Sequence, residues 1–456
     1  MKKTLLFLTF LFISTINAQC WEDIAVGGSH TVYIKSDGTL WAVGGNEFGQ
    51  LGDGTNENRL VPIKIGNDND WKSVTLGSNH QTLAIKTDGT LWTWGRNING
   101  QLGDGTNINK NSPTKIGNDN DWKYVAAGRQ HSIAIKTDGT LWAWGSNSKG
   151  ELGDGTNIDR NSPTKIGNDI DWQSIAAGYR YTMAIKKDGT LWTCGDNDSG
   201  QLGNGKSNIN TNILAQVGSS NDWLLISTRT ITSSAIKKDG TLWTWGNNQQ
   251  GQLGNGDVDN DVAIPTQIGT DTNWKQISSG TLNTSAIKTD GTLWSWGIND
   301  YGQLGDGTYT QKNVPVKIGN DTNWQFVYVG GIHSRGLKTD GTLWGWGLNQ
   351  TGELGDLTNL YTNYPIQINC ATLKTDDFSI VKQYSIYPNP TKGIINIENF
   401  DNKAIKAIRI IDSSGKLVLK QSSNYQQVDL NQIPKGLYII QIENDGKTFN
   451  QKIVKE

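Results

Sequence analysis

Seven copies of the pentapeptide Asp-Gly-Thr-Leu-Trp, spaced 50 or 51 residues apart, limit this chain to a repeat architecture. A second series of tryptophans opens each repeat, and all 19 tryptophans of the chain fall within residues 21–370. Periods of this length are typical of units that bury their faces against their neighbours. The pentapeptides begin at Asp37, Asp88, Asp138, Asp188, Asp239, Asp290 and Asp340, and the opening tryptophans are Trp21, Trp71, Trp122, Trp172, Trp223, Trp274 and Trp324.

Each repeat is predicted to contain four short strands, which in the second repeat cover residues 71–76, 82–86, 91–94 and 113–116. The Asp-Gly pair between the second and third strands is a hairpin signal, because its turn needs positive φ. The third strand carries large side chains on both faces, so each sheet must be sandwiched between neighbours. The 55 glycines also favour short strands and turns over helices, in which each glycine costs about 1 kcal/mol. We therefore expect an all-β fold, a seven-bladed β-propeller of four-stranded blades.

The charge balance limits the partners. Residues 21–370 carry 27 basic and 34 acidic side chains, a net charge of −7. Nucleic-acid binding normally needs a clustered basic face, so we expect no nucleic-acid partner.

The first 18 residues are predicted to be a secretory signal peptide. Lys2 and Lys3 precede an apolar run, and cleavage is expected between Ala18 and Gln19. The run is too short to span a membrane, and no other apolar run approaches 18 residues, so no transmembrane segment is expected. Export would expose the three cysteines to an oxidising compartment.

The repeat pattern Gly-x-x-His-x-x-x-Ile-Lys-x-Asp-Gly-Thr-Leu-Trp-x-Trp-Gly-x-Asn-x-x-Gly-Gln-Leu-Gly-Asp-Gly resembles the regulator of chromosome condensation repeat. The resemblance covers residues 21–370 and implies a seven-bladed propeller that uses a rigid disc to bind another macromolecule. Members include a nuclear nucleotide-exchange factor and a secreted β-lactamase inhibitor protein, so the fold alone does not give the function. The secretory signal and the acidic disc argue against chromatin and small-GTPase roles here.

Four histidines each lie nine residues after an opening tryptophan, with Tyr181, Thr232 and Asn283 at that place in the other repeats. Blades about 50 residues apart do not bring such side chains together as metal ligands, so a structural hydrogen-bonding role is favoured. Cys194 replaces a core tryptophan and is predicted to be a buried, inert thiol. The histidines are His30, His80, His131 and His333.

Alternating carboxylates at Asp257, Asp259 and Asp261 suggest calcium, but Val262 and Ile268 stand where a calcium loop needs glycine and glutamate. The Gly-Asn-Asp-Asn-Asp linkers between repeats are more simply interpreted as Asx turns, and no metal or cofactor is expected. The lysine before each Asp-Gly turn is interpreted as a solvated strand end, offset by the turn aspartate. No catalytic motif is present, although a carboxylate pair of a glycan-cleaving enzyme remains open.

The binding face is predicted from loop variation. In an antiparallel four-stranded blade the first and third connections emerge at one end, and the Asp-Gly turn at the other. The Asp-Gly end is nearly identical in all repeats, whereas the first connections vary. Arginine and tyrosine are frequent interface anchors, so we expect the variable end of blades three to five to bind the partner, with unconstrained loop drift as the alternative. The candidate residues are Arg129, Tyr179, Arg180, Tyr181 and Arg229, with Arg129, Tyr179 and Arg229 central.

Ring closure should bring the ends of the propeller together. Cys20 precedes the first repeat and Cys370 follows the last strand, so a Cys20–Cys370 disulfide is predicted, with two free thiols as the alternative. Closing so long a loop stabilises the fold by about 6 kcal/mol at most.

After a linker at residues 371–381, residues 382–456 contain no tryptophan and show short alternating strands, which indicate a small β-sandwich. This segment resembles the type A C-terminal sorting domain of the type IX secretion system. The resemblance implies recognition by that machinery, export across the outer membrane, removal of the domain, and release or surface anchoring. The matching residues are Tyr387, Pro388, Asn389, Pro390, Gly393, Gly415, Gly436, Tyr438 and Lys452.

Three functions are compatible with these features. The first is a secreted or cell-surface binding or adhesion module for an extracellular protein or glycan. The second is a propeller-based polysaccharide hydrolase or lyase, and the third is a structural component of a surface layer. The absence of a readable catalytic motif favours the binding module over the enzyme.

Overall fold

The computed structural model describes residues 21–368, 384–399, 404–412, 416–444 and 447–456. The chain divides into two compact units, residues 1–374 and 375–456, which are treated separately below. Every regular element assigned in the described ranges is a strand, which confirms the all-β prediction. Four predicted features lie outside the described residues and stay predictions: the signal peptide with its Ala18–Gln19 cleavage site, Cys20, Cys370 and the linker 371–381.

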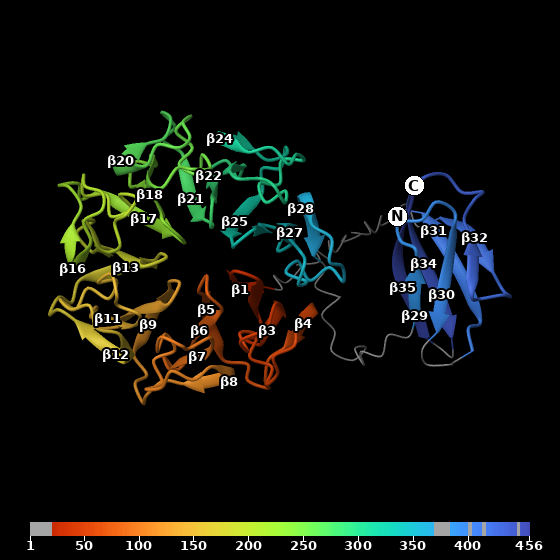
Figure 1. The fold of residues 1–456 in the computed structure, drawn as a ribbon, viewed down its shortest axis with the longest axis horizontal. Coiled ribbons are helices and arrows are strands. Elements are labelled where there is room, and N and C mark those ends of the chain that lie inside the picture. The colour runs from red at the N-terminus through yellow and green to blue at the C-terminus, as the bar shows by residue number, and fades with distance from the viewer. Residues whose placement is uncertain (1–20, 369–383, 400–403, 413–415, 445–446) are drawn as a thin grey trace, which may run out of the picture. The chain divides into compact units, whose positions relative to one another are not determined.

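The first unit consists of seven sheets of four antiparallel strands, one sheet for each repeat (Figure 1). This confirms the predicted seven-bladed propeller. Blades one to four contain β1 (Trp21–Val26), β2 (His30–Lys35), β3 (Leu40–Gly44), β4 (Arg59–Lys64); β5 (Trp71–Leu76), β6 (Gln81–Lys86), β7 (Leu91–Gly95), β8 (Lys110–Lys115); β9 (Trp122–Ala127), β10 (His131–Lys136), β11 (Leu141–Gly145), β12 (Arg160–Ile166); β13 (Trp172–Ala177), β14 (Tyr181–Lys186), β15 (Leu191–Gly195), β16 (Thr211–Gln216). Blades five to seven contain β17 (Trp223–Thr228), β18 (Thr232–Lys237), β19 (Leu242–Gly246), β20 (Val262–Gln267); β21 (Trp274–Ser279), β22 (Asn283–Lys288), β23 (Leu293–Gly297), β24 (Lys312–Lys317); β25 (Trp324–Val329), β26 (His333–Lys338), β27 (Leu343–Gly347), β28 (Thr362–Ile368).

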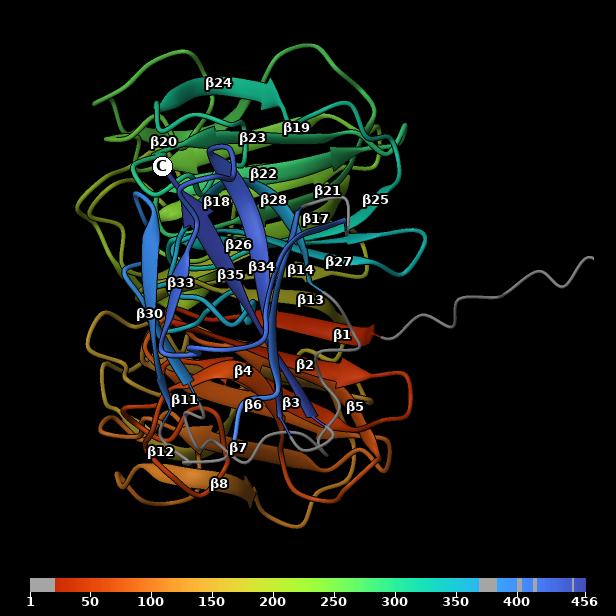
Figure 2. The ribbon, with the colours of Figure 1, turned by 90° about the vertical axis from the view of Figure 1, so that its right-hand side faces the viewer.

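Within each blade the first strand lies next to the central axis, and the fourth strand lies at the rim (Figure 1). Seen edge-on, the strands run across the thickness of the disc (Figure 2). Burial follows this order, because β6 is buried along its whole length whereas β8 is half-buried or exposed. The connections between strands therefore gather at the two flat ends of the disc.

The pentapeptide is explained by the second turn of each blade. Asp88 accepts hydrogen bonds from the backbone N–H of Thr90 at 2.9 Å and from its hydroxyl at 2.7 Å. The Thr90 hydroxyl in turn accepts a bond from the indole N–H of Trp92 at 3.0 Å. Gly89 has φ of 82°, and a Cβ there would stand 2.0 Å from the carbonyl oxygen of Asn120. Each residue type in the turn is thus required by a contact, which accounts for seven nearly identical copies.

Tryptophan joins each blade to the one before it. The buried indole of Trp144 in blade three donates to the carbonyl of Gln101 in blade two at 2.9 Å, and the same bond recurs at Trp94, Trp245, Trp296 and Trp346. In blade four the Sγ atom of Cys194 takes this place, 3.6 Å from the carbonyl oxygen of Glu151. Cys194 is fully buried and burial raises the pKa of its thiol, as expected for an inert core residue.

The ring closes by packing of blade seven on blade one. The Thr31 hydroxyl lies 3.2 Å from Nε2 of His333, and the N–H of Gly331 donates to the carbonyl of Gly27 at 3.1 Å. A shared apolar cluster contains Trp21 of blade one together with residues of blade seven. Within residues 21–368, each blade is formed by the four strands of one uninterrupted repeat.

The lysine before each turn was predicted to be a solvated strand end, and this is wrong in six blades. Lys86 is 7% exposed, with Nζ 4.9 Å from the ring centroids of both Trp71 and Trp92. Its ammonium pairs with Asp68 at 2.7 Å and Asp70 at 2.9 Å, from the link that precedes the blade. Burial opposes the charge, but these two carboxylates raise the pKa of Lys86. Equivalent ion pairs are formed by Lys136, Lys186, Lys237, Lys288 and Lys338.

The second unit is a small β-sandwich, as predicted. One sheet contains β29 (Tyr384–Tyr387), β30 (Ile394–Asn399) and β33 (Gln427–Asp429), and the other contains β31 (Ala407–Asp412), β32 (Leu417–Gln421), β34 (Gly436–Asn444) and β35 (Lys447–Lys455). One core, which includes Ile395, Ile397, Ile408, Ile410 and Ile440, is formed between the two sheets.

Replacing Lys288 by methionine should destabilise the propeller by about 1–3 kcal/mol, because the ammonium lies 4.0 Å from the Trp294 ring centroid and 2.8 Å from Asp271. Methionine keeps most of the aliphatic stem, so the loss reports the charge. Urea unfolding followed by tryptophan fluorescence measures it. Lys275→Met, on the exposed side of β21, is the control and should leave stability unchanged. Equal stabilities of both variants and the parent would contradict a stabilising role for the buried lysine.

Candidate functional site

The second strand of each blade begins with a buried residue that pairs with the glycine ending the third strand. In blade two this residue is Gln81, not the predicted His80, because the loop there is one residue longer. His80 is the additional residue, is half-buried and has φ of 68°. The complete series is His30, Gln81, His131, Tyr181, Thr232, Asn283 and His333.

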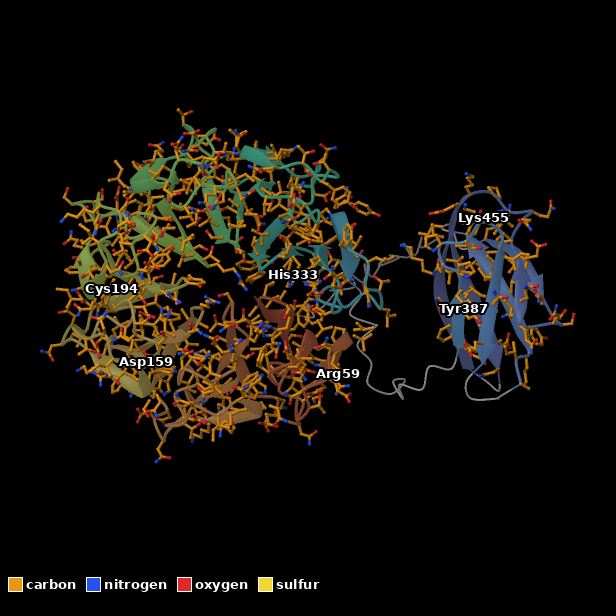
Figure 3. All side chains as sticks on the ribbon, in the orientation of Figure 1. Arg59, Asp159, Cys194, His333, Tyr387 and Lys455 are labelled. Carbon is orange, nitrogen blue, oxygen red and sulfur yellow. The ribbon has the colours of Figure 1, made fainter. Side chains whose placement is uncertain are left out.

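The histidines of this series bond to the next blade, as the structural interpretation predicts. His131 Nε2 lies 3.1 Å from the hydroxyl of Thr182, and His30 Nε2 lies 3.3 Å from that of Thr82. His333 lies near the axis (Figure 3) and makes the equivalent contact with blade one. Within the described residues, no three His, Cys, Asp or Glu side chains are grouped so that they could hold a metal ion.

Tyr181 belongs to the same buried series, and its prediction as a surface contact is wrong. The residue is fully buried, and its hydroxyl contacts the hydroxyls of Thr228 and Ser233 and the carbonyl of Thr232 in blade five. It supports the boundary between blades four and five from within.

Arg129, Tyr179 and Arg180 do come together at the variable end of the disc. All three are half-buried. The Tyr179 ring contacts two guanidinium groups, with its centroid 4.3 Å from Cζ of Arg129 and 5.1 Å from Cζ of Arg180. Burial and the neighbouring charges of Arg180 and Arg96 lower the pKa of Arg129, so positive charge is concentrated here. Burial raises the pKa of Glu151 and the charge of Arg180 opposes this shift, so one carboxyl lies near this group.

The positive surface continues into blades one and two. Arg96 lies over the Phe48 ring at 4.6 Å and donates to the side-chain oxygen of Asn79 at 3.2 Å. The His80 ring also stacks on the Phe48 ring, with the two ring centroids 5.1 Å apart. We call the combined surface the arginine–aromatic strip, and it consists of Phe48, His80, Arg96, Arg129, Tyr179 and Arg180.

The loops that carry the strip are hydrogen-bonded to one another around the axis. The N–H of Arg129 donates to the carbonyl of Gly178 at 3.1 Å, and that of Tyr179 donates to Thr230 at 2.8 Å. The Thr230 hydroxyl donates to the carbonyl of Thr281 at 2.5 Å. These bonds link the first connections of successive blades, so the strip is held in place before any ligand arrives.

Arg229 is not on this outer surface. It is 8% exposed and lines an axial cavity of about 320 Å³ whose walls come from the first strands of all seven blades. Its Nη1 donates to the carbonyl of Val26 at 2.9 Å, from blade five to blade one. The sequence placed Arg229 at the correct end of the disc but did not reveal that its side chain turns into the channel.

The carboxylates of the acidic loop before β20 accept hydrogen bonds from neighbouring amide groups. Asp261 accepts from the side chain of Asn247 at 3.0 Å and from the N–H of Asn248 at 3.1 Å, and Asp257 accepts from the side chain of Asn260 at 2.7 Å.

Two repeat models of the regulator of chromosome condensation (RCC1) match the propeller. One matches residues 37–84, 88–135, 138–185, 239–287 and 290–335, and the other matches 21–50, 71–101, 122–151, 172–201 and 274–303. The chain belongs to the RCC1 repeat family. Residues 385–456 match the secretion system C-terminal sorting domain.

Curated relatives of this RCC1-repeat chain have diverse functions. The ultraviolet-B receptor UVR8 of Arabidopsis thaliana is 28% identical over 65% of this chain and 57% of the receptor. The regulator of chromosome condensation of Xenopus laevis is 31% identical over 25% of this chain and 28% of that protein. The chain thus spans less than two thirds of either relative.

Solved structures support the fold alone. The yeast protein Prp20 in complex with Kap60 is 20% identical, with a TM-score of 0.66 over 85% of this chain and 93% of Prp20. Human WBSCR16 is 23% identical, with a TM-score of 0.61 over 68% of this chain and 84% of that protein.

The sorting tail indicates export by the type IX secretion system, to the cell surface or beyond it. No helical segment in the described ranges has the length and hydropathy needed to cross a bilayer. The Asn389 side chain ties the Tyr-Pro-Asn-Pro motif to β35, through the carbonyl of Lys452 at 2.7 Å and the N–H of Val454 at 2.9 Å. The Tyr438 hydroxyl donates to the carbonyl of Pro434 at 2.9 Å, whereas Gly415 lies outside the described residues.

Lys455, which sequence reasoning did not select, is the buried cation of this unit, and its place at the end of the sandwich is labelled in Figure 3. Its ammonium donates to the carbonyls of Leu430 at 2.5 Å, Asn431 at 3.1 Å and Ile433 at 2.5 Å. The motif residue Lys452 is exposed. The sequence does not show which of Lys452 and Lys455 is buried, because both are lysines in the same strand.

Lys455→Met should reduce export, because it leaves three backbone carbonyls without their donor, at a cost of about 1–3 kcal/mol to the sandwich. The readout is the ratio of released or surface protein to periplasmic protein, with deletion of residues 382–456 as the complete block. Lys420→Met, at an exposed position of β32 outside the sorting motif, is the matched control and should be exported normally. Normal export of Lys455→Met together with a normal melting temperature would refute the structural role.

Stability should fall as the pH drops from about 6.5 towards 4, in part because of His131. Burial lowers the pKa of His131 to about 4. Between about pH 6.5 and pH 4 this histidine is therefore protonated in the unfolded chain but neutral in the folded chain, and this difference favours unfolding. His131→Gln copies Gln81 of blade two and removes this group. The difference in unfolding free energy between pH 7 and pH 4.5, measured with urea, should shrink by about 2 kcal/mol in the variant. An unchanged difference would show that His131 is not held neutral.

Proposed function

We propose that this protein is an exported binding module and that its arginine–aromatic strip binds an anionic extracellular protein or glycan. The observation that carries the proposal is the contact of Arg129 and Arg180 with the ring of Tyr179, on the variable end of an otherwise acidic disc. Planar guanidinium groups form paired hydrogen bonds with carboxylate and sulfate groups, and a neighbouring aromatic ring adds contact area.

Three properties support a binding role for the strip. Its loops are interlinked by hydrogen bonds, so little conformational entropy is lost when a ligand binds. Its positive groups come from three consecutive blades, at Arg96, Arg129 and Arg180, which suits an extended ligand better than a small one. Export by the sorting tail places the disc where such ligands occur. Removal of the tail and either release or surface anchoring of the disc are part of the proposal.

The test compares two charge-matched variants. Arg129→Gln/Arg180→Gln removes two positive charges from the strip, and Lys115→Gln/Lys165→Gln removes two exposed charges from the Asp-Gly end. Polygalacturonate and poly-glutamate serve as anionic probes, with a neutral glucan for comparison. The strip variant should lose about 2 kcal/mol of binding free energy for at least one anionic probe, whereas the lysine variant should bind as the parent does. Raising the salt concentration should weaken the binding of the anionic probe to the parent protein.

Melting curves must first show that both variants are folded. Parent protein that binds neither anionic probe, or equal losses in the two variants, would reject the strip as the binding surface. Shortening of the polygalacturonate chains on incubation would instead favour the polysaccharide hydrolase or lyase.

A further inference from the structure

Arg229 departs from the repeat at a position that is glycine in every other blade, namely Gly27, Gly77, Gly128, Gly178, Gly280 and Gly330. These glycines follow the first strand, beside the axial cavity. A Cβ at Gly128 would stand 2.3 Å from the ring of His131, and one at Gly178 would stand 2.1 Å from the ring of Tyr181. A large residue at the start of the second strand thus excludes a side chain here.

Blade five avoids this steric clash because it differs from the other blades at a second position. Its second strand begins with Thr232, the smallest side chain of the series, and this leaves room for the Cβ of Arg229. A side chain at position 229 thus requires a short residue at position 232. Arg229 places a long cation in a channel whose other lining residues are mainly apolar or hydroxyl-bearing, such as Val26, Leu76 and Ser279. Asp23 is the one carboxylate among these lining residues.

One nitrogen of the Arg229 guanidinium is hydrogen-bonded, and the other two are unpaired in the part of the chain that the structure describes. Nη1 donates to the carbonyl of Val26, which fixes the plane of the group. Nε and Nη2 are buried and have no hydrogen-bond partner among the described residues. Burial lowers the pKa of Arg229 to about 10, and no carboxylate offsets this effect. A buried cation without a counter-ion is costly, so a site of this kind gains stability when an anion enters it.

Two other arginines show which group this edge accepts in the same protein. Arg160 uses Nε and Nη2 to bind Oδ2 of Asp154 at 3.0 and 2.8 Å, and Arg59 uses the same two atoms on Oδ2 of Asp53. The edge that Arg59 and Arg160 fill with a carboxylate is the edge that Arg229 leaves unpaired. The groups whose pKa it perturbs, His30, His80 and His333, are not anions. Asp23 lines the same cavity, but its oxygens accept from the N–H groups of Ile24 and Val74, so no described carboxylate pairs with this edge.

We propose that the Nε–Nη2 edge of Arg229 is a carboxylate-binding site in the axial channel, open to a small organic acid or to a carboxylate side chain of a bound partner. The site is distinct from the arginine–aromatic strip. The strip meets a ligand on the outer surface, whereas Arg229 receives a single anionic group in a cavity of about 320 Å³.

The experiment uses ¹³C-labelled acetate and succinate as probes, with the full mature protein and sodium chloride at matched ionic strength. Saturable broadening of the ¹³C resonance reports binding. Arg229→Gly restores the glycine of the other six blades, and Arg229→Lys keeps the charge but not the two-atom edge. Both variants should bind acetate at least about tenfold more weakly than the parent.

Arg129→Gln/Arg180→Gln separates this site from the proposed function, because it alters the strip and should leave acetate binding unchanged. Loss of acetate binding in that variant, equal binding by Arg229→Gly and the parent, or no saturable binding by the parent would each overturn the assignment. Binding of inorganic phosphate without binding of acetate would overturn the choice of carboxylate. Arg229→Gly must retain a cooperative melting transition, and Arg229→Lys provides the same comparison if it does not.

Discussion

The bond between a third-strand tryptophan and the preceding blade is the contact on which the whole ring depends. Each blade has two large apolar faces, and neither can be buried within a single repeat. Trp144 fills the boundary with blade two and places its N–H on the carbonyl of Gln101, so the polar atom of the largest side chain is satisfied inside the core. Gly103 of the same loop has φ of 77°, and a Cβ there would stand 2.7 Å from that indole. The Gly-Gln-Leu-Gly segment and the tryptophan are therefore two halves of one contact.

This dependence on neighbours confines variation to certain places. Residues that serve a boundary, such as the lysine clamped between two tryptophans, must recur in nearly every blade. The first connections are joined to one another largely through backbone atoms, although Thr230 and Arg229 use their side chains. Side chains there are free to differ from blade to blade, and the arginines and aromatic groups of the strip lie at such positions. The propeller thus separates the residues that close the ring from those available to contact a ligand.

The same separation explains which features could be predicted from the sequence. The number of blades, the strands and the Asp-Gly turns follow from local patterns that recur at a fixed period. The partners of Lys86 could not be found in this way, because Asp68 and Asp70 lie in the preceding link rather than in the adjacent turn. The place of His80 was missed because counting forward from the tryptophan does not reveal one inserted residue, whereas counting back from the Asp-Gly turn does. Tyr181 was misplaced because a residue type enriched at interfaces is also suited to a core with hydrogen-bond partners.

Two buried arginines break the repeat, and their surroundings assign them different roles. Arg335 occupies a position of the second strand that is apolar in blades one to four and serine in blades five and six, and Gly345 opposite makes room for it, since a Cβ there would stand 2.3 Å from Nη1. It lies 5.7 Å from the Tyr33 ring and donates to the carbonyl of Glu353, between the blades that close the ring. Arg229 also has a short neighbour, Thr232, and each of the two arginines has two buried guanidinium nitrogens without a partner among the described residues. Arg229 differs because it lines the axial cavity. Arg335 lies between the two blades that close the ring, whereas Arg229 lies on the wall of a channel, and this difference selects Arg229 as the functional departure.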